Sequence, residues 1–534
     1  MDRDDSDQQQ HLETDHLDDD IEGRTVRGGA ITSVAQVLKS ILEISSTLIL
    51  ARLLTPEDFG LVAMVTAVTG FLSKFKDMGL GMVTVQREEI NHRQVSALFW
   101  INAALGLVIT GIVIALSWGL VWFYDQPEVF GIAVGLAIGF LFKGLLVQHD
   151  AILRRQMRYR ALALVEVTSL AIGLGVAVVL AIQGFAYWAL VANTVVYSVA
   201  HFIGLWIACG WRPAVPGGAD DLRDLVVFGA NLTGFSFVNY FARNLDDVLI
   251  GRFHGANELG LYQKAYEILM VPINQINNPA RRVAIPALSR MVSEPERYRR
   301  TYLRIMEKLL LLTMPLGALL VGSADWVVLS VLGDQWVEAA PIFAVLGISI
   351  FSQAIGNTTG WLFISQDRTD DMFKWGFIGS GTAVVSFLIG LPWGAFGVAL
   401  AYSIVGVFVR TPLLLWYVGL KGPVRTKDFY AVAWPAALAA LGAGVGLVGL
   451  RAITIFEHPL VNLAIAIPVA GVSAFAVTMS FPRGREILAD ARLLLDHLQA
   501  SADEQPDEGR EARMSKVLES ETDADDGDGE LRRD

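Results

Sequence analysis

Apolar segments long enough to cross a lipid bilayer follow one another along almost the whole chain. A spanning helix needs about 20 mostly apolar residues, because each residue advances a helix by about 1.5 Å. Such stretches predict an all-α integral membrane protein of about fourteen spans, near 29–52, 59–80, 97–123, 128–148, 161–183, 186–210, 225–251, 259–282, 303–323, 326–364 (the span itself over 340–364), 373–393, 396–418, 429–450 and 459–481. Only 18% of the 534 residues are charged, against about 25% in soluble globular proteins, which argues against a water-soluble enzyme.

The acidic residues of the sequence are concentrated at its two ends. Residues 1–20 carry nine acids and one base, and residues 501–534 carry thirteen acids and five bases. Because such low hydrophobicity and high charge cannot support a packed core, we expect disordered acidic tails over 1–24 and 500–534. Between the last span and the second tail, residues 483–499 alternate Leu and Ile with charges, a pattern typical of an amphipathic surface helix.

The Lys and Arg residues of the short loops predict how the chain lies in the membrane. With the N-terminus inside, the inner loops hold 22 of these residues, whereas the outer loops hold only Arg52, Arg252 and Arg451. Cytoplasmic loops of membrane proteins carry such an excess of positive charge. We therefore expect a multi-pass protein of the cytoplasmic membrane with both termini in the cytoplasm.

One short motif occurs twice in the chain. Residues 51–61 align without a gap to residues 251–261, with a small residue, Arg, an acid, an apolar residue, Gly and Leu in register. A chance match between two Leu-rich segments is the alternative to a true repeat. An offset of six spans gives both halves the same orientation, which predicts a pseudo-two-fold axis along the membrane normal and a substrate site between the halves. The domains would be six-helix bundles over 25–212 and 223–418, with two further helices over 428–481.

Four local segments resemble a known family of membrane proteins. They are Ala51–Gly60, Gln148–Met157, Asn239–Asp246 and Gly260–Tyr262, and they are similar to Wzx-type polysaccharide flippases of the multidrug/oligosaccharidyl-lipid/polysaccharide (MOP) exporter superfamily, nearest to the colanic-acid-exporter type. The resemblance covers about residues 25–480. It implies two six-helix bundles plus two C-terminal helices, a central cavity lined by helices 1, 2, 7 and 8, and flipping of an isoprenoid-diphosphate-linked oligosaccharide by alternating access.

Ionisable and amide side chains cluster in three of the four spans that the resemblance implies line the cavity, 29–52, 225–251 and 259–282. A charge at mid-membrane costs on the order of 2.5–3.5 kcal/mol on insertion scales, so it usually faces protein or water. The candidates for a substrate-binding cavity are Lys39, Asn239, Tyr240, Arg243, Lys264, Asn274 and Gln275. The candidates for charge pairing or for binding a coupling ion are Lys143, Glu166, Glu43, Asp246, Asp247 and Glu267.

These residue types suit the three parts of a lipid-linked glycan. Lys39, Arg243 and Lys264 would attract a phosphate or diphosphate, and an Arg can bind phosphate oxygens through two parallel hydrogen bonds. The amide and Tyr side chains would exchange hydrogen bonds with sugar hydroxyls. The isoprenoid tail would stay in the surrounding membrane lipids.

Simple charge pairing is the competing interpretation for several of these residues. Lys39 with Glu43, and Arg243 with Asp247, are spaced i,i+4 and would form static pairs on one helix face.

Two further features concern charge and metal binding. Lys143 and Glu166 would pair within the first bundle, either as a structural contact or in ion coupling, and Arg410 has no partner that the sequence identifies. With one Cys and no metal-ligand spacing among the His residues, we expect no metal site.

The function predicted from these features is export of a lipid-linked oligosaccharide for polysaccharide or lipopolysaccharide biosynthesis. The alternatives are an ion-coupled multidrug or small-molecule antiporter of the same superfamily and, less well supported, a membrane glycan ligase or glycosyltransferase. The sequence has no ATP-binding motif and no long outer loop, so we expect no enzyme activity and no cofactor, with H⁺ or Na⁺ as the candidate coupling ions. The expected partners are the glycolipid, membrane lipids and a polysaccharide polymerase or glycosyltransferases, and not nucleic acid.

Overall fold

The computed structural model describes residues 8–9, 12, 21–72, 79–87, 89–214, 222–453, 456–482 and 484–485, and in 21–27, 30 and 222–243 only the backbone. The chain divides into two compact units, residues 1–474 and 475–534. Most of the predicted acidic tails and of the predicted surface helix over 483–499 lies outside the described residues.

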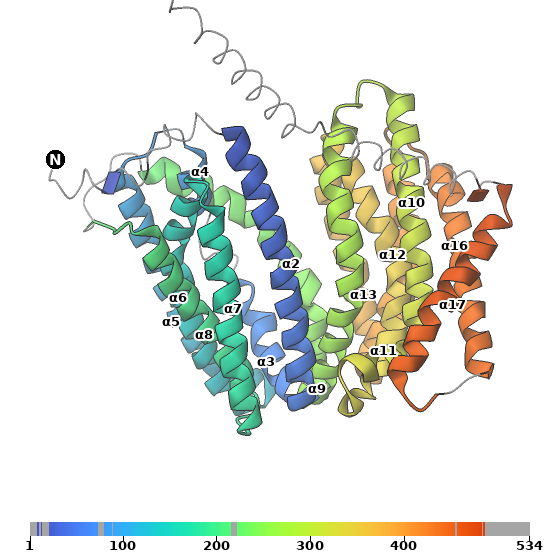
Figure 1. The fold of residues 1–534 in the computed structure, drawn as a ribbon, viewed down its shortest axis with the longest axis horizontal. Coiled ribbons are helices and arrows are strands. Elements are labelled where there is room, and N and C mark those ends of the chain that lie inside the picture. Colours follow the sequence, from blue (N-terminus) through green and yellow to red (C-terminus); the bar gives the residue numbers. More distant parts are fainter. Residues whose placement is uncertain are drawn as a thin grey trace, which may run out of the picture. The chain divides into compact units, whose positions relative to one another are not determined.

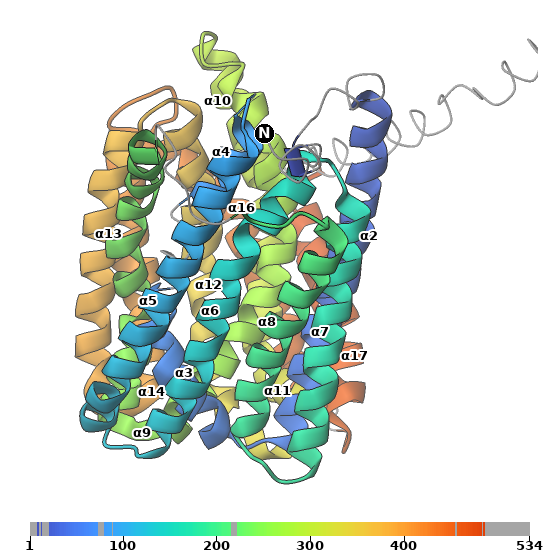
Figure 2. The same ribbon diagram turned by 90° about the vertical axis from the view of Figure 1, so that its left-hand side faces the viewer.

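Within the described residues every regular element is helical. The first half of the chain forms α2 (Ile21–Leu53), α3 (Pro56–Thr69), α4 (Leu80–Gln86), α5 (His92–Tyr124), α6 (Glu128–Arg155), α7 (Tyr159–Ile182) and α8 (Trp188–Cys209). The second half forms α9 (Leu222–Ser289), α10 (Pro295–Gly322), α11 (Ala324–Val331), η3 (Asp334–Trp336), α12 (Ala339–Ser365), α13 (Thr369–Gly390), η4 (Leu391–Trp393), α14 (Gly394–Val405), η5 (Gly406–Arg410), α15 (Thr411–Gly419), α16 (Thr426–Ile453) and α17 (Pro459–Met479). The helices of residues 1–474 run side by side in the two views of Figures 1 and 2.

These helices make the chain a multi-pass membrane protein. Ten helical segments of the described residues are long and apolar enough to cross a bilayer, and all fourteen predicted spans fall at least partly on helices. Two predicted spans, 225–251 and 259–282, are halves of α9, which breaks at Gly255 (φ 85°, ψ −178°). Only glycine adopts this backbone conformation without strain, so the chain can reverse there. The many polar residues of α9 explain why it is missing from the ten apolar segments.

The repeated motif performs a different local task in each half of the chain. In the first copy, Thr55 caps α3: Asp58 accepts hydrogen bonds from the Thr55 backbone N–H (2.9 Å) and hydroxyl (2.8 Å), with Pro56 at the first helical position. In the second copy, the carboxylate of Glu258 accepts a hydrogen bond from the backbone N–H of Ala395 at 2.7 Å, at the start of α14. Each acid therefore accepts a hydrogen bond from a backbone N–H at the start of a helix. Asp58 does so for its own helix, α3, and Glu258 for a different helix, α14.

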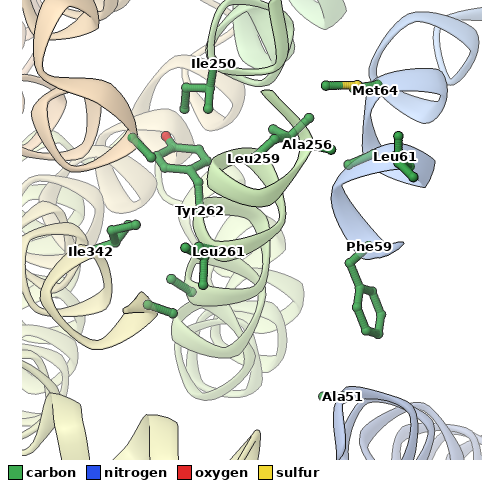
Figure 3. Close-up of a cluster of buried hydrophobic side chains, with 14 of the residues drawn as sticks. Ala51, Phe59, Leu61, Met64, Ile250, Ala256, Leu259, Leu261, Tyr262 and Ile342 are labelled. Atoms are coloured by element: carbon green, nitrogen blue, oxygen red, sulfur yellow. The ribbon is translucent and has the colours of Figure 1, made fainter. Parts of the chain in front are cut away.

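The two copies of the motif also contact each other where α3 packs on α9. A Cβ atom at Gly60 would collide with the carbonyl oxygen of Ala256, and a Cβ atom at Gly260 would collide with the carbonyl oxygen of Pro56. Because positions 56 and 60 are the repeat equivalents of 256 and 260, the contact is the same in both directions. Leu61 and Met64 of α3 and Leu259 of α9 belong to the surrounding apolar core (Figure 3).

Part of the N-terminal segment that we expected to be disordered contacts the ends of α5 and α6. The Gln9 side chain accepts a hydrogen bond from the His92 backbone N–H (2.7 Å) and donates one to the Ile90 carbonyl (3.2 Å). The Leu12 side chain is buried, and its carbonyl accepts a hydrogen bond from Arg155 Nε at 2.9 Å. These contacts tie the segment before α2 to this end of the helices.

Candidate functional site

A large cavity lies among the helices of residues 1–474. Its volume is about 2080 Å³, and its lining comes mainly from α2, α9, α12 and α13, two of which, α2 and α13, stand out in Figure 1. In the part of the chain that the structure describes, α3 contributes no lining residue, although the family resemblance implied helices 1, 2, 7 and 8. The reason is that α3 is packed on α9 through the Gly60–Ala256 contact.

Amide side chains are frequent in the cavity wall. Two of the predicted substrate-binding residues, Asn274 and Gln275, are among them. The amides that line the cavity are Gln36, Asn193, Asn244, Gln263, Asn274, Gln275, Asn277, Asn278, Gln353 and Asn357. Each amide offers two donors and an acceptor, so the wall can exchange many hydrogen bonds with a hydroxyl-rich ligand.

Lys39 of α2 is bound to α7 rather than to its own helix alone. Its Nζ lies 2.6 Å from an oxygen of Glu166 and 4.0 Å from Glu43, the predicted i,i+4 partner. Lys143, which we expected near Glu166, has its Nζ 5.5 Å from the centre of the Phe140 ring. Glu43 lines the cavity, whereas the Lys39–Glu166 pair connects two helices beside it.

Lys264 is also held by a carboxylate. Its Nζ lies 2.7 Å from Glu267 and 4.4 Å from the centre of the Phe59 ring of α3, and its side chain is almost fully buried. Glu267 lines the cavity and accepts a hydrogen bond from the Thr47 hydroxyl of α2 at 3.0 Å. Lys264 therefore belongs to the contact between α3 and α9, with Glu267 between it and the cavity.

Asp246 and Asp247 join the two halves of α9 across the break at Gly255. Asp246 accepts a hydrogen bond from the Tyr262 hydroxyl at 2.7 Å, and Asp247 accepts one from the Gln263 amide at 3.0 Å. All four residues line the cavity. The other carboxylate oxygen of Asp246 is buried without a hydrogen-bond partner among the described residues.

Three predicted residues cannot be placed in the cavity. The structure describes the backbone of Asn239, Tyr240 and Arg243, which is part of α9, but it does not describe their side chains. Their part in the site stays a prediction.

Two cations and eight of the ten amides that line the cavity were not among the candidate site residues named from the sequence. Arg281 and Arg410 are the lining residues with positive charge within the described part of the chain, against four lining carboxylates. Two of these amides, Gln353 and Asn357, lie on α12. The signal for Arg410 was present, since a charge inside a predicted span is itself unusual.

The Lys39–Glu166 geometry gives a direct test of what Lys39 does. The substitution Lys39→Glu would place a third carboxylate beside those of Glu43 and Glu166. We expect the transport rate to fall about fivefold or more, because losing a partly exposed ion pair costs about 1 kcal/mol. Because the 2.6 Å pair ties α2 to α7, the exchange Lys39→Glu with Glu166→Lys should restore transport. Transport by the single and double variants, at matched membrane levels, measures this. A double variant as defective as Lys39→Glu would instead make Lys39 a direct ligand.

Comparison with known proteins now identifies the family. The sequence model of the family described as "Polysaccharide biosynthesis protein" matches residues 49–341. The teichuronic acid biosynthesis protein TuaB of Bacillus subtilis is 30% identical over 350 residues, which cover 65% of this chain and 72% of TuaB. The chain belongs to this polysaccharide biosynthesis family. The lipopolysaccharide biosynthesis protein WzxC of Escherichia coli is 24% identical over 414 residues, 76% of this chain and 82% of WzxC.

The comparison with solved structures identifies the fold of the chain. The lipid II flippase MurJ in an inward closed conformation superposes with a TM-score of 0.68 at 14% identity, over 84% of this chain and 98% of that chain. The fold is that of the MOP superfamily. The predicted resemblance to Wzx-type flippases is thus confirmed, and the polysaccharide biosynthesis family makes this chain a flippase-like membrane transporter rather than an enzyme.

Proposed function

We propose that the protein flips an isoprenoid-(di)phosphate-linked oligosaccharide from the cytoplasmic to the outer leaflet by alternating access. The observation that carries this proposal is the cavity of about 2080 Å³ lined by amide side chains, in a chain of the polysaccharide biosynthesis family. Amides donate and accept at the same time, as sugar hydroxyls do, so the wall is complementary to a glycan. The cargo is destined for a surface polysaccharide, and its expected protein partners are a polymerase or glycosyltransferases.

We assign direct substrate contact to Asn239, Tyr240, Arg243, Asn274 and Gln275. Asn274 and Gln275 support this because they line the cavity. Arg243 would lie one helical turn from Asp247, within the same half of α9.

The other predicted residues act through charge. Lys39 and Lys264 are proposed to contribute positive charge while paired with Glu166 and Glu267. The lining carboxylates Glu43, Asp246, Asp247 and Glu267 are proposed as sites for a coupling H⁺ or Na⁺.

The repeat supports a two-fold architecture for this transporter. We propose six-helix bundles over 25–212 and 223–418, related by a pseudo-two-fold axis along the membrane normal, with helices over 428–481 added. The reciprocal contact of Gly60 and Gly260 with the opposite copy supports this arrangement. With both termini in the cytoplasm, as the loop charges predict, this contact lies at the outer end of the cavity.

A second function is favoured by one observation. Four carboxylates and two guanidinium groups line the cavity within the described residues, a balance that would suit a cationic substrate. The alternative is therefore an ion-coupled small-molecule antiporter of the same superfamily.

The experiment that separates the two functions is an analysis of lipid-linked glycans in a strain lacking the protein. Mass spectrometry identifies the glycolipids, and an impermeant glycan-cleaving reagent reports which leaflet holds them. We expect a full-length lipid-linked oligosaccharide to accumulate on the cytoplasmic face while surface polysaccharide is lost. A complementing copy of the wild-type chain should reverse both effects.

Other outcomes would contradict the flippase. An unchanged glycolipid pool together with increased sensitivity to organic cations would support the antiporter. A truncated glycan would mean that the missing step is a synthetic one.

A further inference from the structure

Arg410 stands out among the charged residues of the membrane-spanning helices. It is the last residue of η5, between α14 and α15, and it lines the cavity. A guanidinium at this depth is costly in lipid and persists where it meets water, protein or a ligand. A role for Arg410 therefore has to be found in the cavity.

The backbone around Arg410 is specialised. Residues 406–410 form a single π-helical turn, a feature that is frequent at functional sites. Pro412 would direct its ring at the carbonyl of residue 408 in a regular α-helix, which explains why the helix widens here. The Thr411 hydroxyl fixes the turn through hydrogen bonds to the Gly406 carbonyl and the Ser352 hydroxyl, both at 2.8 Å.

Two neighbours hold the guanidinium in place without neutralising it. Its Cζ atom lies 4.6 Å from the centre of the Tyr402 ring, within cation–π distance. A Cβ atom at residue 406 would lie 3.0 Å from Nη2 of Arg410, so Gly406 makes room for the side chain. Both Tyr402 and Arg410 line the cavity, and no carboxylate among the described residues is within ion-pair distance of Arg410.

This distinguishes Arg410 from the two lysines that the sequence singled out. Lys39 and Lys264 each lie within 2.7 Å of a carboxylate, and an anion could bind them only by displacing that partner. Within the described part of the chain, Arg410 has no carboxylate partner, and its guanidinium N–H groups make no hydrogen bond.

The depth of Arg410 matches that of the amides on α9. The Glu258–Ala395 hydrogen bond sets α9 and α14 in register at one end of the cavity. From there, Arg410 is fifteen residues along its helix and Asn274 sixteen along α9, about 22 and 24 Å at 1.5 Å per residue. A ligand that contacts Asn274 with a sugar can therefore reach Arg410 at the same level.

We propose that Arg410 binds an oxyanion of the transported glycolipid, with Tyr402 and Gly406 positioning its guanidinium. The oxyanion is either the phosphate of the isoprenoid carrier or the carboxylate of an acidic sugar, because both accept two parallel hydrogen bonds from a guanidinium. This inference rests on the proposed flippase function and names the residue that meets the charge of its substrate.

The test is equilibrium binding to the full-length protein in lipid nanodiscs. The probes are a long-chain isoprenyl diphosphate, a glucuronate-containing oligosaccharide and, as a neutral reference, the isoprenyl alcohol. For at least one anionic probe we expect Arg410→Ala to raise the Kd about tenfold or more, or about 1.4 kcal/mol, and Arg410→Lys to raise it less. Gly406→Ala should raise the Kd of the same probe severalfold, because the added Cβ atom displaces the guanidinium of Arg410.

The matched control is Arg451→Ala. Arg451 also lies over an aromatic ring, 4.3 Å from the centre of Trp326, but it is outside the lining of this cavity. We expect it to leave the Kd of both anionic probes within twofold of wild type, and the melting temperature of each variant reports folding. If Arg410→Ala fails to fold, Arg410→Lys and Gly406→Ala carry the test.

The outcomes separate this inference from the proposed function. The anionic probe that responds identifies the oxyanion as the carrier's phosphate or the sugar's carboxylate. If Arg410→Ala binds both anionic probes as tightly as wild type, the proposed role of Arg410 is wrong. The flippase function would then still be tested separately by the analysis of lipid-linked glycans. Failure of wild type to bind either anionic probe would overturn both the role of Arg410 and an anionic substrate.

Discussion

Replacing Gly60 by Val should abolish transport, because no side chain fits between α3 and α9. A Cβ atom at Gly60 meets the Ala256 carbonyl oxygen, and this is backbone that no rotamer change can move away. The two helices would have to separate, and the surrounding core would lose its packing. We expect Gly60→Val to lower the transport rate at least tenfold. Gly260→Val should lower it to a similar extent, because a Cβ atom at residue 260 would collide with the carbonyl oxygen of Pro56.

Spin labels at the exposed, repeat-equivalent positions Glu57 and Asn257 can follow the separation. The distance between the labels should increase in Gly60→Val relative to wild type. Gly111→Val is the matched control, because a Cβ atom at this helical glycine meets nothing within 4 Å. Equal transport by Gly60→Val and Gly111→Val would contradict the importance of the contact.

Replacing Trp336 by Ala should be the most destabilising single change at the same end of the cavity. Trp336 is fully buried, its ring centre lies 5.5 Å from that of Phe59, and its Nε1–H donates to the Ala51 carbonyl at 2.7 Å. Removing a buried aromatic side chain of this size costs on the order of 3–5 kcal/mol. The residue joins η3 to α2 and α3, so both stability and transport should fall.

Unfolding in detergent with a chemical denaturant measures this loss. Trp336→Phe keeps most of the packing and removes the hydrogen bond, so it should cost only about 1 kcal/mol. An Ala variant no less stable than the Phe variant would show that the packing of Trp336 is unimportant.

Much of the fold could be predicted because bilayer physics dictates it. Apolar segments of bilayer length have to become helices, and the Thr-Pro-Glu-Asp sequence at 55–58 carries the signals of a helix start. The separation between spans 225–251 and 259–282 was predicted and falls at Gly255, whereas the short length of α3 was not predicted. The contact of α3 with α9 joins segments 200 residues apart, which periodicity within one segment does not report.

The site was predictable as a set of residue types but not as a set of pairs. Asn274, Gln275 and the four lining carboxylates were found, because polar residues inside a span must face water or protein. The partner of Lys39 was missed, since Glu166 is 127 residues away and reaches it only through the packing of α2 on α7. Arg410 was noticed without a role, because its role depends on which side chains surround it, and the described residues near it include no carboxylate within ion-pair distance.

The bond from Glu258 to the start of α14 has a mechanical consequence. In the first copy of the repeat, the equivalent acid, Asp58, has its hydrogen bonds within the described residues to Thr55 at the start of its own helix. In the second copy, Glu258 accepts a hydrogen bond from the backbone N–H of Ala395. The helix that begins there continues through α14 and η5 to Arg410. A displacement of α9 near Gly260 would therefore be transmitted to the start of α14, the helix that leads to Arg410.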